Sequence, residues 1–260
     1  MKIPIFYVDT FTDKIFTGNP AAVCIVEEMP LESIIDNIVT ENNLPATVFL
    51  KRDREGFAIR WFTPRELDFC GHGTLAAAYV VFNFLEPQRS MIQFYSKKEV
   101  LSVHRTQDFI TIVMLGQEIE PQQISALSRK ELGLEVEDVF GCVGERCVFV
   151  LKTEEEVKNL QPDFSVLKKL NYRGFVFTAP GNEFDFVSRT FYPDKKIPED
   201  YVTGVSHRFL APYWAKRLNK NILKCYQASS RGGFLKCEVQ GNKLFMSSEA
   251  VLYMQGVITL

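Results

Sequence analysis

One stretch of the chain is apolar on every helical face. Residues 75–82 read Leu-Ala-Ala-Ala-Tyr-Val-Val-Phe, which predicts a helix that is buried on all sides. Such a helix has to run through the middle of a folded unit. Its first turn, preceded by Cys70, presents unpaired backbone N–H groups and the positive end of the helix dipole, so we expect a carboxylate or phosphate to bind there.

Shorter patterns fill the rest of the chain. Apolar side chains at residues 31–39 repeat at helical spacing after Pro30, which predicts a second helix. The other apolar runs are short, β-branched or aromatic and bounded by turn residues, which predicts strands. These runs lie at 3–8, 22–26, 47–50, 57–62, 92–95, 100–104 and 109–113, and then at 148–151, 174–178, 184–190, 223–227, 234–239, 243–246 and 251–258.

A later stretch repeats the layout of the first helix. Residues 199–207 place acidic residues, a Gly and a His ahead of the apolar residues 209–214. The two halves therefore look built on one plan, although chance similarity between two strand-to-helix transitions is the alternative. Pro212 removes a hydrogen-bond donor inside the helix predicted around residues 209–214, so we expect a kink there.

A chain of 260 residues can bury a sizeable core, as one large domain or as two small ones. The segment 116–123 contains Pro121 and few apolar residues, so it is the best candidate for a linker. We expect an N-terminal lobe over 1–116 and a C-terminal lobe over 117–260, with the last strand able to return to the first lobe.

Composition excludes several classes of function. The formal charge is -2 and no basic run occurs, which argues against nucleic acid or an anionic membrane as partner. Asp9 interrupts the first apolar run too early for a signal peptide or a membrane span. The six cysteines form no C-x-x-C pair and the three histidines are scattered, so we expect a reduced, cytoplasmic protein without a metal or other cofactor.

Several motifs occur in a recognisable order. They read "VDTFTDKIFTGNPAAV", "RWFTPRELDFCGHGTLAAA", "FDFVSRTFYP", "EDYVTG" followed by "SH", "APYW" and "SSRGGFLKCEV". This order resembles the phenazine-biosynthesis-like (PhzF) family of isomerases over nearly the whole chain. The resemblance implies an α+β diaminopimelate-epimerase-like fold, with two pseudo-symmetric lobes that each wrap a sheet or barrel around a central buried helix. It also implies an active site in the cleft where the two helix N-termini converge, and it suggests a homodimer.

Proton transfer next to a carboxylate is the chemistry that the resemblance implies. Such a C–H proton is weakly acidic, so an acid and a base have to lie within hydrogen-bond reach of the reacting carbon. The family's acid/base is a glutamate in a motif resembling N-L-S-E-T, and the matching residues 43–47 place Ala46 at the glutamate position. Glu41 is near but belongs to the preceding helix pattern. In the later motif Asp200 persists, but Val205 replaces the family's serine.

A thiol offers another route. The run "CGHGT" also resembles the first catalytic motif of proline racemase and, less closely, that of diaminopimelate epimerase, and both of these use a cysteine. Cys70 stands at that position, where a helix N-terminus favours the thiolate. The matching position in the second half is Thr203, so a one-thiol mechanism would need Asp200 or His72 as its partner. The alternative is that Cys70 is a small buried core residue.

The candidate residues form two groups. Cys70, His72 and Asp200 are the candidate acid/base residues. The candidate ligand-binding residues are Asn19, Gly71, Gly73, Thr74, Thr203, Gly204, Ser206, Arg231 and Gly232.

Each candidate also has a structural alternative. His72 can be a buried histidine bonded to backbone, and Asp200 can cap the second helix. Arg231 and Gly232 can form a tight turn. His207 resembles a residue of the family's cleft, and His104 lies in an alternating strand and is expected to be structural.

Three functions remain open. The protein is an isomerase or epimerase acting on a small carboxylate with an altered base, or a catalytically silent relative that binds a small carboxylate or phosphate, or an interaction scaffold. Turnover of a small molecule separates the first from the other two. Stabilisation by a ligand without turnover favours the second, and a stable protein partner favours the third.

Overall fold

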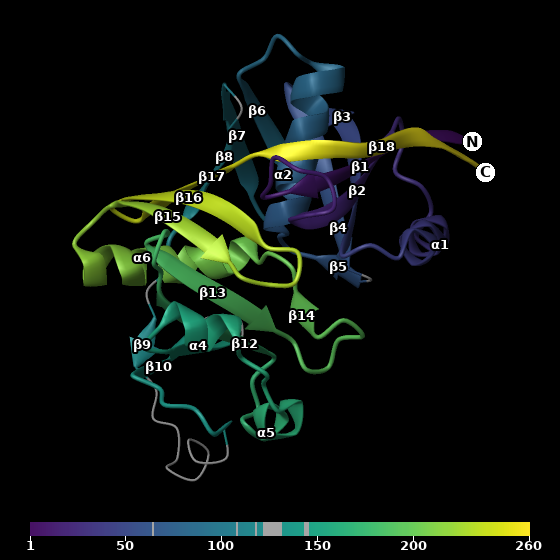
Figure 1. The fold of residues 1–260 in the computed structure, drawn as a ribbon. Helices are drawn as coiled ribbons and strands as arrows, with labels where there is room; N and C mark the ends of the chain where they lie inside the picture. The colour runs from purple at the N-terminus through teal and green to yellow at the C-terminus, as the bar shows by residue number, and fades with distance from the viewer. Residues whose placement is uncertain (64, 108, 118, 122–131, 143–145) are drawn as a thin grey trace. The chain divides into compact units, whose positions relative to one another are not determined.

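The computed structural model describes residues 1–260 except 64, 108, 118, 122–131 and 143–145 (Figure 1). The chain divides into two compact units. Unit 1 comprises Met1–Met114 and Phe245–Leu260, and unit 2 comprises Leu115–Leu244. The end of the chain therefore belongs with the first half, and Figure 1 shows β18 in yellow running beside β1 in purple.

Unit 1 is built on one curved run of strands in the order β18–β1–β2–β3–β4–β6–β7–β8. Neighbours are antiparallel except for the parallel pairs β2–β3 and β4–β6. β5 pairs with β4, and β17 pairs with β8. The strands are β1 (Lys2–Thr10), β2 (Asn19–Val26), β3 (Ala46–Asp53), β4 (Gly56–Thr63), β5 (Arg65–Leu67), β6 (Met91–Tyr95), β7 (Val100–Thr106), β8 (Phe109–Leu115), β17 (Lys243–Ser248) and β18 (Ala250–Thr259).

The central helix of unit 1 is α2 (Gly71–Val80), which packs on β1, β2, β3 and β18. All of its residues except Tyr79 are buried. It continues into a single π-helical turn, η1 (Val81–Leu85). The prediction of a fully buried helix is confirmed, because a helix without a polar face is stable only when strands surround it.

A second helix, α1 (Glu32–Asn42), covers the other face of the same strands. Its buried residues Ile35, Ile38 and Val39 pack with Phe49 and Phe62. Side chains of a strand alternate between its two faces. The strands between α1 and α2 are therefore apolar on both sides.

Unit 2 repeats this plan with different strands. β9–β10–β11 are antiparallel, β11–β12 parallel, β12–β13 antiparallel, β13–β15 parallel and β15–β16 antiparallel, while β14 pairs with β13. The strands are β9 (Glu120–Pro121), β10 (Asp138–Cys142), β11 (Arg146–Val150), β12 (Gly174–Pro180), β13 (Phe186–Phe191), β14 (Glu199–Asp200), β15 (Ile222–Gln227) and β16 (Gly233–Gln240).

Helices cover both faces of this sheet as well. On one face lies α6 (His207–Leu218), where Trp214 stacks on Phe186 at 5.7 Å and donates its Nε1–H to Thr178 Oγ1 at 3.0 Å. On the other face lie α4 (Glu154–Lys158) and α5 (Phe164–Lys169), whose apolar residues join the core around Phe177. Each unit is thus a mixed α+β layer structure, as predicted.

Every run predicted as a strand overlaps a strand, although Leu151 lies beyond the end of β11 and residues 184 and 185 precede β13. Several elements were not predicted. These are β5, β9, β10, β14, α4 and α5. The predicted linker contains β9, and its residues 118, 122 and 123 lie outside the described residues. The helix expected around residues 209–214 is α6. It begins at His207, after the 3-10 turn η2 (Gly204–Ser206), and not at Gly204.

Pro212 lies inside α6, and the helix continues through it. A proline lacks the N–H that would bond to the carbonyl four residues earlier, which here is that of Arg208. Arg208 O instead accepts the N–H of Gln117 at 2.7 Å, and Arg208 Nε donates to Leu115 O at 3.0 Å. The helix defect therefore anchors the segment that follows β8.

Within the described part of the chain, none of the helices is both long enough and apolar enough to cross a membrane.

Candidate functional site

The first turn of α2 carries the first group of candidate residues. Cys70 is the N-cap residue, in an extended conformation, and the first helical bond runs from Thr74 N to Cys70 O at 2.9 Å. Thr74 Oγ1 donates to the same carbonyl at 2.8 Å. The N–H groups of Gly71, His72 and Gly73 precede this bond, so they lie at the positive end of the helix dipole and outside the bond ladder of the helix.

Cys70 and His72 form a close pair at this turn. Cys70 Sγ lies 3.3 Å from His72 Nδ1, and both residues are buried, with exposures of 6% and 8%. The thiol thus contacts the imidazole instead of capping the helix. A thiol and an imidazole at this distance can exchange a proton directly, which is the arrangement that activates cysteine in acid/base and nucleophilic sites.

Gly73 explains how the turn fits against the strands. A Cβ at this position would lie 2.8 Å from Trp61 Cδ1 and 3.0 Å from Val48 Cγ2. It would also lie 3.2 Å from Cys70 Sγ. Only glycine allows β3 and β4 to approach the helix this closely, so Gly73 has a packing reason as well as a place in the ligand-binding prediction.

Ala46 begins β3 and is fully buried. It lies on the same face of the strand as Val48, two residues further on, and Val48 packs on the first turn of α2. Ala46, the position that the resemblance matches to a glutamate, therefore faces the first turn of α2. Glu41 is exposed on α1, the helix on the opposite face of these strands, so it does not face this turn.

Asn19 begins β2, next to this region. It is fully buried, and its carbonyl accepts the hydroxyl proton of Thr10 at 2.8 Å. Ala21, two residues later, is the register partner of Ala46. Asn19 and Ala46 thus lie at the same end of adjacent parallel strands.

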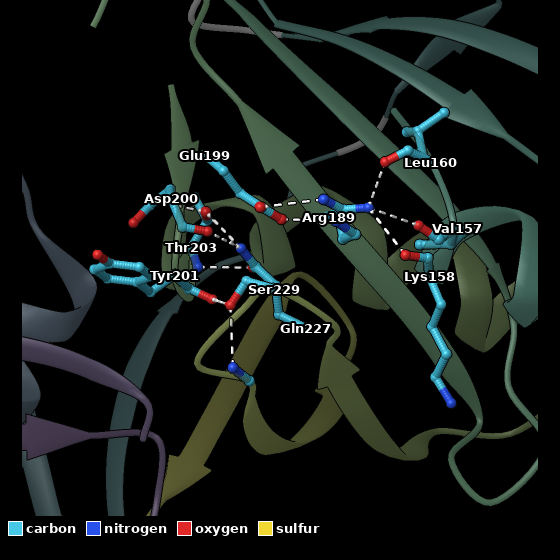
Figure 2. Close-up of polar contacts among 11 residues, drawn as sticks. Val157, Lys158, Leu160, Arg189, Glu199, Asp200, Tyr201, Thr203, Gln227 and Ser229 are labelled. Atoms are coloured by element: carbon cyan, nitrogen blue, oxygen red, sulfur yellow. Dashed lines mark hydrogen bonds and ion pairs between the residues drawn. The ribbon is translucent and has the colours of Figure 1, made fainter. Parts of the chain in front are cut away.

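In unit 2, Asp200 belongs to a network whose hydrogen-bond directions are fully determined (Figure 2). Thr203 N–H can only donate, and it bonds to Gln227 Oε1 at 2.8 Å. Gln227 Nε2 therefore donates to Asp200 O at 2.8 Å and to Thr203 Oγ1 at 3.2 Å. The hydroxyl proton of Thr203 is then left for Asp200 Oδ2, 2.8 Å away. The network presents Asp200 as a hydrogen-bond acceptor, as a base has to be.

The turn before α6 holds the remaining candidates of this half. Thr203, Gly204 and Ser206 are buried, and Ser206 N donates to Thr203 O at 3.1 Å. Asp200 lies six residues before the N-cap of α6, Ser206, and its carboxylate receives the Thr203 hydroxyl. This contact orients the carboxylate, which a simple capping role for Asp200 does not require.

His207 is the first residue of α6 and is completely buried. Its Nδ1 lies 3.1 Å from Thr203 O, so that nitrogen carries the proton of the neutral ring. Nε2 has no hydrogen-bond partner among the described residues, and the ring packs on Phe186 at 5.8 Å. Burial lowers the pKa of His207 from 6.5 to about 4, only partly opposed by the bond to Thr203 O. His207 is therefore a neutral residue that holds the turn.

Arg231 and Gly232 lie in a tight turn next to Tyr201. The guanidinium of Arg231 lies over the Tyr201 ring at 5.4 Å, and Ser229 Oγ donates to Tyr201 O at 2.6 Å. Gly232 has a φ of +64°, and a Cβ there would lie 2.2 Å from Tyr226 Oη. The turn is thus packed beside the residue that follows Asp200, which fits both the ligand-binding and the structural interpretation.

Arg189 is a residue that the sequence analysis missed. It is 8% exposed, and it pairs with Glu199 through Nε at 2.7 Å and Nη2 at 3.1 Å. Its Nη1 donates to three carbonyls at the C-terminal end of α4 and just beyond it, those of Val157, Lys158 and Leu160 (Figure 2). Because Glu199 precedes Asp200, this pair fixes β14. The available signal was an arginine within a predicted strand, since charged residues are buried only when paired.

His104 lies in β7 and is partly buried, opposite Met91 and Thr111 in the neighbouring strands. This position fits the structural role expected for it. Among the described residues, no three His, Cys, Asp or Glu side chains are grouped so that they could hold a metal ion.

Known proteins resemble this chain both in sequence and in fold. The profile of the family described as "Phenazine biosynthesis-like protein" matches residues 8–256. An uncharacterized isomerase of Pseudomonas aeruginosa is 38% identical over 263 residues, covering all of both chains. The crystal structure of a phenazine biosynthesis protein of the PhzF family from Enterococcus faecalis is 41% identical, covers 100% of both chains and superposes with a TM-score of 0.94.

A more distant structure shows how widely the fold is shared. A hydroxyproline epimerase from Agrobacterium vitis, with trans-4-hydroxy-L-proline bound, has a TM-score of 0.68 at 10% identity and covers 99% of this chain and 92% of its own. At this identity the likeness shows the fold alone. The predicted epimerase-like fold class is confirmed.

The Arg189 pair leads to a prediction about stability. Arg189→Met leaves the Glu199 carboxylate without its partner, so we expect the free energy of unfolding to fall by about 3 kcal/mol or more. Urea unfolding measures this loss. Lys98→Met, which removes an exposed pair with Asp68, should cost about 1 kcal/mol or less. The double variant Arg189→Met, Glu199→Met should recover part of the loss, and equal losses in the single variants of Arg189 and Lys98 would contradict the assignment.

His207 leads to a prediction about pH. Its folded pKa lies below its unfolded value, so the unfolded chain binds the proton more strongly and stability is lost as the pH falls. We expect the free energy of unfolding to fall by about 1.4 kcal/mol per pH unit between pH 6.5 and pH 4 from this residue. Urea unfolding at pH 7, 6 and 5 should show a shallower slope for His207→Asn and the wild-type slope for His104→Asn. Equal slopes in all three proteins would contradict it.

Proposed function

The chain belongs to the phenazine biosynthesis-like family of isomerases, and from this premise we propose that it transfers a proton beside the carboxylate of a small ligand bound at the first turn of α2. The observation that carries the proposal is the contact of 3.3 Å between Cys70 Sγ and His72 Nδ1. It places an acid/base pair beside N–H groups suited to an anion.

The proposed chemistry uses only groups of this turn. Cys70 passes its proton to His72 and then, as thiolate, takes the proton from the carbon next to the ligand carboxylate. The electron pair of that C–H bond moves into the carboxylate as an enediolate, whose charge the N–H groups of the turn stabilise. Return of the proton from the Cys70 thiol to the opposite face of the same carbon completes an epimerisation. In a ligand with a C=C bond next to that carbon, return of the proton to the far end of the double bond completes an isomerisation, because the electron pair then shifts the double bond by one position. In both cases His72 gives its proton back to the thiolate and restores the thiol.

Ala46 makes the thiol necessary for this proposal. A methyl group transfers no proton, and the nearest carboxylate in sequence, Glu41, lies on the far side of the strands. The position faces the turn but is closed by packing. We therefore propose that Cys70 and His72 are the acid/base pair of this chain, acting on a small carboxylate other than the substrate of the family's named member.

Asp200 supports a second candidate for the base. The network of Gln227 and Thr203 leaves its carboxylate as an oriented acceptor, which is the form that removes a proton. In this version the proton transfer takes place beside Asp200 within unit 2, and Cys70 is a packing residue.

A function without catalysis is the remaining alternative. A silent relative would keep the anion-binding turn of α2 and lose turnover, and a scaffold would lose both. If neither Cys70 nor Asp200 transfers a proton, alanine at position 46 and valine at position 205 favour the silent relative or the scaffold over the isomerase.

The first test concerns binding. Citrate, sulfate or phosphate should raise the melting temperature more than chloride at equal ionic strength, because a ligand that binds only the folded state stabilises it by mass action. Differential scanning fluorimetry over a concentration series measures the shift. Equal shifts for all four anions would remove the proposed binding turn.

The second test concerns chemistry. Small amino and hydroxy carboxylates are incubated with the protein in D2O, and loss of the C–H signal beside the carboxylate is followed by proton NMR. Cys70→Ala should lower the exchange rate by about 10²–10⁴-fold, while Asp200→Asn should keep it; the reverse result identifies Asp200 as the base. Cys24→Ala, which removes another buried thiol of unit 1, is the matched control and should keep the wild-type rate.

The same assay tests Ala46. We expect no isomerisation of dihydro-hydroxyanthranilate, the substrate implied by the resemblance to the family's named member, because the carboxylate is absent. Activity gained by Ala46→Glu would show that the remaining site is intact. No exchange by wild type with any compound, and none by Ala46→Glu, would favour the silent relative.

A further inference from the structure

Trp61 brings an unused hydrogen-bond donor to the first turn of α2. We propose that the Nε1–H of Trp61 donates a hydrogen bond to a carboxylate or phosphate bound at that turn, and so helps to select anionic ligands. The inference rests on the proposed binding function, and it adds a residue that is not among the candidate ligand-binding residues named from the sequence.

The indole is placed by its contact with Gly73. Trp61 lies in β4 on the face toward α2, and its Cδ1 is the atom closest to the place where a Cβ on Gly73 would lie, at 2.8 Å. Nε1 is bonded directly to Cδ1, so the N–H belongs to the ring edge that faces the turn. Cys70 Sγ borders the same place at 3.2 Å. The donor, the thiol and the helix N–H groups are therefore neighbours.

The state of this donor is unusual. The Trp61 side chain is 1% exposed, and in the part of the chain that the structure describes its Nε1 has no hydrogen-bond partner. A buried N–H without an acceptor destabilises a fold, and native structures rarely keep one without a reason. An acceptor supplied by a ligand removes this cost, and it adds to the attraction of an anion toward the turn.

The chain's other tryptophan shows the contrast. Trp214 is also fully buried, but its Nε1–H bonds to Thr178 Oγ1 at 3.0 Å inside unit 2. Its donor is part of the fold. These are the only two tryptophans of the chain, so a variant that lacks one of them shows the fluorescence of the other alone.

The surroundings of the indole favour the turn over the nearest cavity. Trp61 also lines a cavity of about 120 Å³ together with Glu66, Asp68 and Lys97. The two carboxylates there repel an anion, and Lys97 is already paired with Glu66 at 2.6 Å. The half-buried ring of Phe69 packs edge-on against the indole at 6.0 Å, so a ligand oxygen that reaches Nε1 from this side displaces that ring.

Conservative variants test the donor. Trp61→Phe keeps an aromatic ring and removes the N–H, and Trp214→Phe is the matched control. Citrate is the probe, and its dissociation constant is measured by isothermal titration calorimetry and by the fluorescence of the remaining tryptophan. We expect Trp61→Phe to raise the dissociation constant about tenfold or more, since a hydrogen bond to a charged group is lost. Trp214→Phe should keep the wild-type constant.

Two further readouts separate a ligand donor from a structural residue. Without citrate, Trp61→Phe should melt at or above the wild-type temperature, because it removes an unsatisfied donor, whereas Trp214→Phe should melt lower. In Trp214→Phe the emission of Trp61 should shift on adding citrate, while in Trp61→Phe the emission of Trp214 should not.

The outcomes are distinct. Citrate binding to wild type with the same constant in Trp61→Phe overturns the role of Trp61 and leaves the proposed binding turn intact. Absence of any citrate binding to wild type removes both. Lower stability of Trp61→Phe without citrate, together with unchanged binding, assigns Trp61 to packing alone.

Discussion

The burial of α2 is the constraint on which the rest of unit 1 depends. A helix with no polar face has to be surrounded, and here β1, β2, β3 and β18 enclose it. The apolar sides of this helix have no group that binds a polar ligand, so its N-terminal turn is the part with hydrogen-bond donors for one. Gly73 brings the strands against the N-terminal end. The same packing that stabilises the unit thus places Cys70, His72 and Trp61 around one set of backbone N–H groups.

Unit 2 reaches a related arrangement by different means. Its helix α6 starts after a turn that is held by side chains: Gln227 fixes the Thr203 hydroxyl, and His207 holds the Thr203 carbonyl. Because Gln227 Nε2 donates to Thr203 Oγ1, the hydroxyl proton of Thr203 is left to donate to the Asp200 carboxylate and orients it. Arg189 fixes the neighbouring residue, Glu199, to the end of α4. The polar network here performs the positioning that close apolar packing performs in unit 1.

The sequence predicts elements where the signal is local. The apolar repeat after Pro30 predicts α1, and the all-apolar run after Cys70 predicts α2, because both depend on spacings of a few residues. Short elements such as β14 depend on partners far away in sequence and leave no such signal. The start of α4, which was not predicted, does carry a local signal, the capping box of Thr153 and Glu156. The candidate residues Cys70 and His72 could be paired from spacing, but Gln227, Arg189 and Trp61 contact residues that only the fold brings near them.

Within the proposed function, Ala46 separates binding from catalysis. The N–H groups at the start of α2 are backbone groups, so they persist in any sequence that forms this helix. A side chain can change in one substitution without disturbing that turn, and the buried Ala46 of β3 stands where the resemblance implies a glutamate. What the loss does to function depends on whether another group can exchange protons at the same place. Cys70 and His72 meet that condition by distance and position. In the proposed function, the absence of a carboxylate at Ala46 therefore changes the group that exchanges protons and leaves the backbone N–H groups of the turn in place.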